Sequence, residues 1–186
     1  MPRPSAFPGL HSPAAGFDQP FDMLAACHDR VRRSLALLER LLPHLQAHGP
    51  DAQARDAARD VLRYFDMAAP AHHEDEERHV IPLLLGSSNA ELQAAAQRML
   101  ADHHLIREGW ARLAPLLRSV TEGQPVSMET LQPEAIDFVR LHHAHLDLED
   151  TLAFPHAHQH LGHDQAAVQA MGAEMAARRG VRTAGG

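Results

Sequence analysis

The segment HHEDEERHVIP (residues 72–82) places two histidines and four acidic residues in a row, and after Arg78 and His79 it turns apolar and closes on a proline. A second segment, HLDLEDTLAFP (residues 145–155), has the same layout. Aligned on their prolines, both read H-x-x-x-E-[ED]-x-x-x-x-P, with a His ten residues and a Glu six residues before the Pro. Two segments with matching offsets predict a functional internal repeat.

The composition around these segments favours an all-α protein. The 186 residues fit one domain, and they are 45% apolar but only 4% aromatic, with many Ala and Leu. The net charge is −7 with His neutral, and no basic block is present, so nucleic acid is not expected as a partner. Histidine is the unusual component, at 16 residues.

The cysteine count and the start of the chain indicate a cytoplasmic setting. A single cysteine, Cys27, excludes an internal disulfide framework and any Cys-based zinc or iron–sulfur site within one chain. The first twenty residues contain five Pro and no apolar run, which predicts neither a signal peptide nor a membrane anchor. We expect residues 1–19 to be a flexible Pro-rich arm and residues 20–182 to be the folded domain.

Apolar residues recur at helical spacing in four long stretches. A Ser88–Glu91 capping box is expected to open the third stretch, and Pro70 is expected to kink the second. The breaks between stretches are too short to favour a crossover, so the pattern predicts an up-down-up-down four-helix bundle with a short C-terminal helix. The expected helices span residues 20–48, 51–85, about 88–120, 129 or 133 to 154, and, for the short one, 164–179.

In each of the four stretches the apolar residues form a stripe along one helix face, and this stripe is interrupted by His, or by His and Glu. Ionised carboxylates in a bundle core cost several kcal/mol each unless they are paired or bound to metal. The chain has no Lys, and no Arg lies on these stripes beside the two glutamates. Bound cations therefore explain the inward-facing polar set best, and the candidate metal ligands are His28, His72, Glu76, His103, His145 and Glu149.

A mixed imidazole and carboxylate set suits iron, manganese or zinc, and the lack of thiolates argues against structural zinc. If both glutamates bridge two ions and each ion takes two His, an oxo or hydroxo bridge makes each ion five-coordinate. One octahedral position per ion then stays open for a small molecule. Two other metal motifs fit poorly: H-E-x-x-H is absent, and the E-x-x-H of ferritin-like proteins occurs only at Glu76–His79.

Over about residues 20–182 the chain resembles the hemerythrin-like, or HHE cation-binding, family. The matching stretches are ACHDRVRRSL, HHEDEERHVIP, DHHLIREGW, HAHLDLEDTLAFP and MGAEMAARRGV. The resemblance implies a four-helix bundle holding a non-haem di-iron centre, two iron ions that bind O₂ or related small molecules. By motif position it implies the same six ligands.

The chain departs from the oxygen carriers of this family on the third helix. Those proteins have H-x-x-x-H there, whereas His103 is followed at that spacing by Arg107. His142, one turn before His145, is a candidate for the additional ligand, and a hydrogen-bonding role beside the metal is the alternative. The remaining histidines are expected in such outer roles or in solvent: His73 (with Glu77), His104, His143, and His156, His158, His160 and His163 of the tail.

The resulting hypothesis is a protein that binds O₂, NO or peroxide for sensing, scavenging or delivery, rather than a dedicated enzyme. The alternative is a di-iron enzyme with ferroxidase-, peroxidase- or oxygenase-like activity, which a channel and a substrate pocket would favour. A third hypothesis is repair of damaged iron–sulfur centres, although the relatives with that role carry an N-terminal Cys-bearing domain and residues 1–19 contain no Cys. No membrane partner is expected, and a homodimer is compatible with the sequence.

Overall fold

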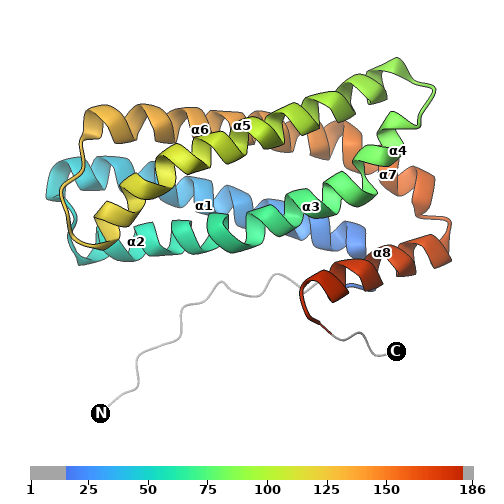
Figure 1. Cartoon of the computed structure of the whole chain (residues 1–186), viewed down its shortest axis with the longest axis horizontal. Helices are drawn as coiled ribbons and strands as arrows, with labels where there is room; N and C mark the ends of the chain where they lie inside the picture. Colours follow the sequence, from blue (N-terminus) through green and yellow to red (C-terminus); the bar gives the residue numbers. More distant parts are fainter. Residues whose placement is uncertain (1–15, 182–186) are drawn as a thin grey trace, which may run out of the picture.

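The computed structural model describes residues 16–181, and all regular structure in that range is helical. The longest helices are α1 (Pro20–His48), α5 (Ala90–Thr121) and α6 (Met128–Leu148), and α2 (Ala52–Arg63) lies beside them (Figure 1). Both α1 and α5 pack against α2 and α6, so the helices enclose one interior. Residues 1–15 of the expected arm lie outside the described part of the chain.

The second predicted helix, residues 51–85, is broken into pieces. After α2 comes a π-helical segment, η1 (Tyr64–Ala68), and then α3 (Ala69–His79) and α4 (Ile81–Leu85). Pro70 is the second residue of α3 and Pro82 the second residue of α4. Because proline has no N–H to donate to the preceding turn, the α-helical hydrogen-bond ladder cannot run through either position.

The fourth predicted helix shows the same effect near its end. The α-helix α6 gives way to a π-helical segment, η2 (Glu149–Ala153), and then to α7 (Phe154–Leu161), whose second residue is Pro155. Helical structure therefore continues past the predicted end at Phe154. Pro70 and Pro155 each follow a five-residue π-helical segment by the same offset. Irregular helix therefore precedes the first of the two repeat segments and lies within the second.

The predicted start of the third helix is wrong by one residue. The N-cap of α5 is Asn89, whose side chain accepts a hydrogen bond from the Glu91 N–H at 2.8 Å. This contact takes the Glu91 N–H that the expected Ser88–Glu91 box needs, and Ser87 Oγ accepts from the Asn89 N–H at 3.2 Å. Asparagine is as good an N-cap as serine, so local hydrogen bonding decides between them.

The short C-terminal helix is present as α8 (Gln165–Arg178), capped by the Asp164 side chain. Its C-terminal arginines hold it against α3: Arg178 and Arg179 both reach the buried carboxylate of Asp75, and Arg179 does so at 2.6 Å. Buried carboxylates need such partners, which makes α8 a support for α3. No helix within residues 16–181 combines the length and apolar character needed to cross a membrane.

The buried apolar residues form two clusters rather than one core. One lies among α1, α2, α5 and α6 and includes Val31, Leu35 and Ile106. The other lies towards α4, α7 and α8 and includes Leu24, Val80 and Met99. On each helix the candidate ligands fall between a residue of one cluster and a residue of the other, so a polar layer separates two apolar cores.

Candidate metal centre

The six predicted residues come together in this polar layer. All are buried, with at most 2% of any one exposed. They come from α1, α3, α5, α6 and η2, so the layer closes only when the bundle does. Two overlapping groups result, each with ligand atoms within 4.8 Å of one another.

The first group, site A, consists of His28, His72, Glu76 and Glu149. His28 Nε2 lies 3.2 Å from Glu149 Oε2 and 4.0 Å from Glu76 Oε1. His72 Nε2 lies 3.1 Å from the same Glu76 Oε1. Site A therefore offers two imidazole nitrogens and two carboxylate oxygens.

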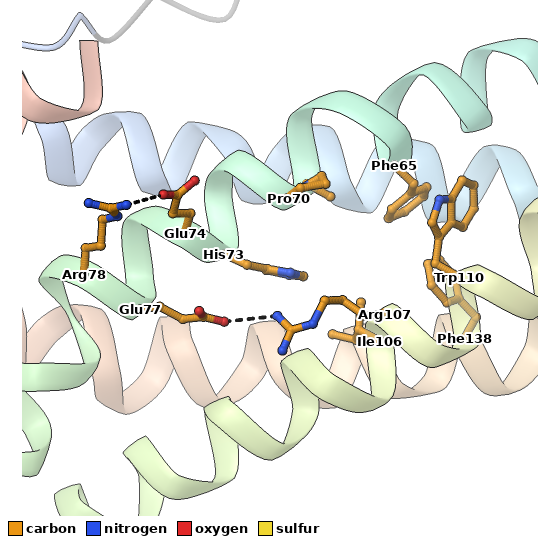
Figure 2. A pocket seen from close by; sticks show the side chains of 11 residues that line it. Phe65, Pro70, His73, Glu74, Glu77, Arg78, Ile106, Arg107, Trp110 and Phe138 are labelled. Carbon is orange, nitrogen blue, oxygen red and sulfur yellow. Dashed lines mark hydrogen bonds and ion pairs between the residues drawn. The ribbon is translucent and has the colours of Figure 1, made fainter. Parts of the chain in front are cut away.

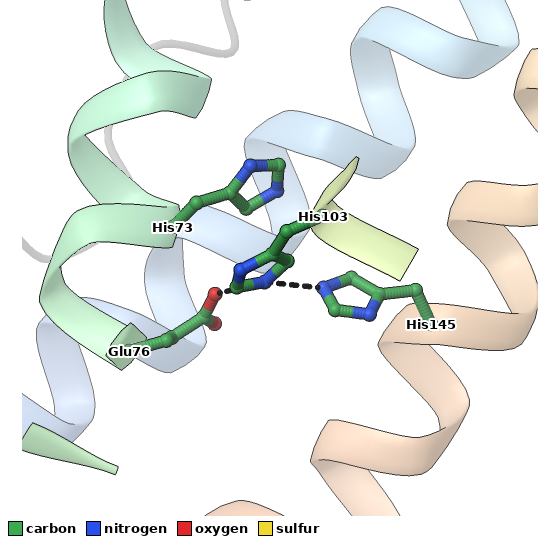
Figure 3. Close-up of side chains that lie close together, drawn as sticks. All are labelled: His73, Glu76, His103 and His145. Atoms are coloured by element: carbon green, nitrogen blue, oxygen red, sulfur yellow. Dashed lines mark hydrogen bonds and ion pairs between the residues drawn. The ribbon is translucent and has the colours of Figure 1, made fainter. Parts of the chain in front are cut away.

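The second group, site B, consists of His73, Glu76, His103 and His145 (Figure 3). His103 Nε2 lies 3.3 Å from Glu76 Oε2 and 3.1 Å from His145 Nε2. The ring of His73 is stacked on that of His103, with centroids 4.2 Å apart. His145 Nε2 also lies 2.9 Å from Glu149 Oε1, so site B offers three imidazoles.

Both carboxylates present one oxygen to each site. Glu76 directs Oε1 to the histidines of site A and Oε2 to His103 of site B. Glu149 directs Oε2 to His28 of site A and Oε1 to His145 of site B. This arrangement is suited to a pair of neighbouring cations bridged by two carboxylates.

Carboxylates outside the layer orient two of the imidazoles and lie near a third. His28 Nδ1 donates to Asp150 at 2.7 Å and His103 Nδ1 donates to Glu77 at 2.8 Å, while His145 Nδ1 lies 3.7 Å from Asp102. A proton on Nδ1 leaves the Nε2 lone pair directed into the layer, as metal ligation requires. Each outer carboxylate is itself paired with an arginine: Arg32, Arg107 and Arg98 respectively.

Burial and the charges of neighbouring side chains together set the protonation of the layer. Burial, and then the facing carboxylate of Glu149, raises the pKa of Glu76 well above its ordinary value. Burial opposes ionisation of Glu149, but His145 and His28 hold its pKa well below the ordinary value. Burial lowers the pKa of His72 to about 3, whereas for His145 the carboxylates of Glu149 and Asp102 outweigh burial and raise the pKa to about 9.

The protein does not satisfy the polar atoms of this layer by itself. Within residues 16–181, buried atoms without a hydrogen-bond partner include His28 Nε2, His72 Nε2, and both carboxylate oxygens of Glu76 and Glu149. Buried polar atoms are almost always paired in proteins, and each one left unpaired costs about 1–3 kcal/mol. Buried nitrogen and oxygen atoms that converge with their hydrogen bonds unmade fit bound cations.

His73 is the residue that sequence reasoning missed. It was expected in an outer role or in solvent, but it is only 6% exposed and belongs to site B. At about 100° per residue, Glu76 points about 40° round the helix from His72, between the directions of His72 and His73. A glutamate bridging two ions therefore has one adjacent histidine on each side, and this angular relation was the available signal.

His142 lies beside the layer but belongs to neither group. Its Nδ1 donates to the Phe138 carbonyl at 2.9 Å, and its ring meets that of Phe65 edge to face and is tilted against that of Phe138. Burial lowers its pKa to about 4, which makes it a neutral member of the apolar core. The fifth imidazole near the layer is supplied by His73, which lies on α3.

The other outer residues lie as expected. His104 and His143 are exposed, and His104 pairs with Glu108 on its own helix. In the tail, His156 is half-buried and His158, His160 and His163 are exposed. Glu77 contacts the centre only through His103.

Comparison with known proteins points to a single family. Residues 19–157 match the family model described as the hemerythrin HHE cation binding domain. An uncharacterised protein of Haemophilus influenzae is 30% identical over 168 residues, a match that covers 90% of this chain and 94% of that protein. The matched range contains all the residues of sites A and B. The chain belongs to the hemerythrin HHE cation-binding domain family.

Proposed function

We propose that the protein is a non-haem di-iron protein that binds O₂, NO or peroxide for sensing, scavenging or delivery. The observation that carries this proposal is that Glu76 and Glu149 each direct one oxygen to site A and one to site B. A single ion does not need two carboxylates that each direct their oxygens to different sites. Two neighbouring ions do, and the family's cation-binding description supports metal as the occupant.

In this proposal His28 and His72 bind one ion, His73, His103 and His145 bind the other, and the two glutamates bridge them. The ion at site A then has four protein ligands and the ion at site B has five. Six-coordinate iron, if bound at both sites, would have more positions free of protein ligands at site A, and we expect the small molecule to bind there. When bound, the iron pair supplies reversible redox chemistry.

The chain's own contribution is orientation and exclusion of water. Asp150 and Glu77 accept hydrogen bonds from Nδ1 of His28 and His103, which supports a ligand set that is preformed rather than gathered by the metal. The apolar clusters on both sides of the layer limit the access of water, which favours reversible binding of a neutral diatomic molecule.

The proposal extends to topology and setting. The contacts of α1 and α5 with α2 and α6 support an up-down-up-down four-helix bundle. A single cysteine that belongs to neither metal group supports a cytoplasmic protein.

The test is metal analysis of protein from iron-replete cells, followed by visible spectra recorded without O₂ and after adding O₂, NO or peroxide. We expect close to two iron ions per chain, and bands that change with the added molecule and reverse on removing O₂. Protein that consistently retains one ion or none would contradict the dinuclear centre. Two ions with spectra indifferent to all three molecules would contradict the ligand assignment.

A di-iron enzyme is the second candidate. It is favoured by a cavity of about 450 Å³ that His73 lines, because a diatomic ligand needs far less room.

A further inference from the structure

The cavity beside His73 lies between α3 and α5, with η1 and α6 at its inner end. Figure 2 shows the imidazole of His73 projecting into it, with Phe65, Trp110 and Phe138 grouped at the other end. Its volume, about 450 Å³, lies within the range of pockets that hold small organic molecules. Its apolar lining is Phe65, Ala69, Pro70, Ile106, Trp110 and Phe138.

The inner wall is buried and aromatic. Phe65 and Phe138 are 3% and 2% exposed, and their rings meet edge to face with centroids 5.0 Å apart. Trp110 lies 5.1 Å from Phe65, and its indole N–H donates to Asp66 at 2.9 Å. Because that N–H is already used, the indole offers the cavity an apolar surface, which favours an aromatic or similarly flat molecule.

The mouth of the cavity carries charges that are already paired. Arg78 pairs with Glu74 at 2.6 Å and Arg107 pairs with Glu77 at 3.2 Å (Figure 2). An anion or a cation entering the cavity would compete with these pairs. The pairing therefore favours a neutral molecule over a carboxylate or an amine.

His73 is the polar group that lies between the paired charges and the aromatic residues of the cavity (Figure 2). Among residues 16–181 neither of its ring nitrogens makes a hydrogen bond within the protein, and one of them belongs to site B. Its ring separates the cavity from the metal layer, because it stacks on His103 on one side and lines the cavity on the other. A molecule in the cavity would therefore lie against a residue proposed to bind the second ion.

We propose that this cavity binds a small, neutral, largely apolar organic molecule of about one aromatic ring, held against His73. This inference deepens the proposed function, because the neighbourhood of the ion at site B rests on that function. In this inference an organic molecule binds beside the proposed di-iron centre, in addition to the small molecule that binds at the metal.

Trp110 is the only tryptophan in the chain, so its fluorescence reports on the cavity directly. Benzyl alcohol is the probe, because it does not absorb where tryptophan is excited, and benzoate and benzylammonium are its charged counterparts. We expect a saturable change in Trp110 emission with a Kd on the order of 1 mM for benzyl alcohol, and weaker binding of both ions. Tighter binding of benzoate, or no saturation up to the solubility limit of benzyl alcohol, overturns the inference.

Two variants locate the site. Ile106→Phe fills the cavity and should weaken benzyl alcohol binding by at least about tenfold. Ile136→Phe places the same ring at a half-exposed position on α6 outside the cavity and should leave binding unchanged. If Ile106→Phe does not fold by circular dichroism, Ala69→Val is used in its place. If the filling variant and the control variant change benzyl alcohol binding equally, the molecule does not bind in this cavity.

Proximity to the metal centre is tested by magnetic resonance. Protein loaded with Mn²⁺ should shorten the proton relaxation times of benzyl alcohol, whereas protein loaded with Zn²⁺ should not. Unchanged relaxation with bound Mn²⁺ overturns the placement against His73. If the protein takes up no metal but still binds benzyl alcohol saturably, the proposed function is contradicted and the cavity assignment stands.

Discussion

At the scale of the residue, the centre depends on how each side chain is aimed. Adjacent histidines on one helix serve different sites: His72 turns to site A and His73 to site B. Adjacent acids differ in the same way, since Glu76 enters the layer and Glu77 contacts it only through His103. Which candidate ligand belongs to which site therefore depends on the direction of each side chain, and residue type alone does not give that direction.

His73 and His142 are two buried histidines for which the structure makes opposite predictions. His73→Gln should lower retention of one of the two ions, because site B loses one of three imidazoles. His142→Gln should keep both ions, since its hydrogen bond goes to Phe138 and it belongs to neither site. The measurement is metal content after gel filtration. Loss of one ion from His142→Gln, with both kept by His73→Gln, would reverse the assignment.

Glu76→Ala and Glu77→Ala should differ in degree. Glu76 meets both sites, so its loss should abolish the proposed dinuclear centre, as should the loss of Glu149. Glu77→Ala and Asp150→Ala remove partners of imidazoles and should weaken metal affinity by about 10–100-fold without changing the stoichiometry. Competition with a coloured chelator measures both effects. Equal effects in all four variants would show that the bridging assignment is incorrect.

At the scale of the element, irregular helix and an added helix shape the centre. The π-helical segment η1 precedes His72 by one turn, and η2 begins at Glu149 itself. A π-helical turn holds one more residue than an α-helical turn, so it changes the direction in which later side chains point. The α8 helix then braces α3, the element that carries three of the candidate ligands.

The brace can be tested through Asp75. Replacing both Arg178 and Arg179 by Ala leaves a fully buried carboxylate without its partners, which should cost about 3 kcal/mol and lower Tm by roughly 10 °C. Replacing Arg59 and Arg63, which make exposed pairs within α2, should cost about 1 kcal/mol or less. Thermal melts followed by circular dichroism make the comparison. Similar losses for both double variants would mean that α8 does not support α3.

At the scale of the whole molecule, the polar layer links metal binding to folding. Its residues come from helices far apart in the sequence, and it divides the apolar interior in two. Cations that bind only the folded arrangement stabilise it by mass action, by about 4 kcal/mol for an ion present at a thousand times its Kd. Removal of metal should therefore affect the whole bundle and not only one end.

Chelation should lower Tm by roughly 10 °C at pH 8 and by less at pH 6. The pKa of about 9 means that His145 holds a proton below that pH in the metal-free protein, and a metal ion must displace it. Metal affinity should then fall about tenfold for each pH unit below 9 for this proton alone. His72, with a pKa of about 3, is already neutral and adds no dependence between pH 6 and pH 8.

Scanning calorimetry with and without a strong chelator, at both values of pH, measures this difference. His143→Gln, which alters an exposed histidine outside both sites, serves as the control and should behave as the unchanged protein. A Tm that does not respond to chelation would show that metal is not part of the folded structure. A larger effect at pH 6 than at pH 8 would contradict proton displacement from His145.

The sequence by itself determined the helical class and the six residues His28, His72, Glu76, His103, His145 and Glu149 that meet in one layer. These follow from helical periodicity, because the face on which a residue lies depends only on its neighbours along the chain. It also predicted a disturbance of the second helix at Pro70, since the missing N–H is a local property, although Pro43, Pro115 and Pro133 lie inside α1, α5 and α6.

Only the tertiary structure decided that His73 joins the layer and His142 does not. That choice depends on where α5 and α6 place His103, His145 and Phe138 against α3, and no spacing within one helix encodes it. The pairing of Asp150 with His28 and the cavity beside His73 arise in the same way, from residues more than a hundred positions apart or on several elements. The helix face on which a side chain lies is set locally by the sequence, but the residues that this side chain meets are set by how the helices pack.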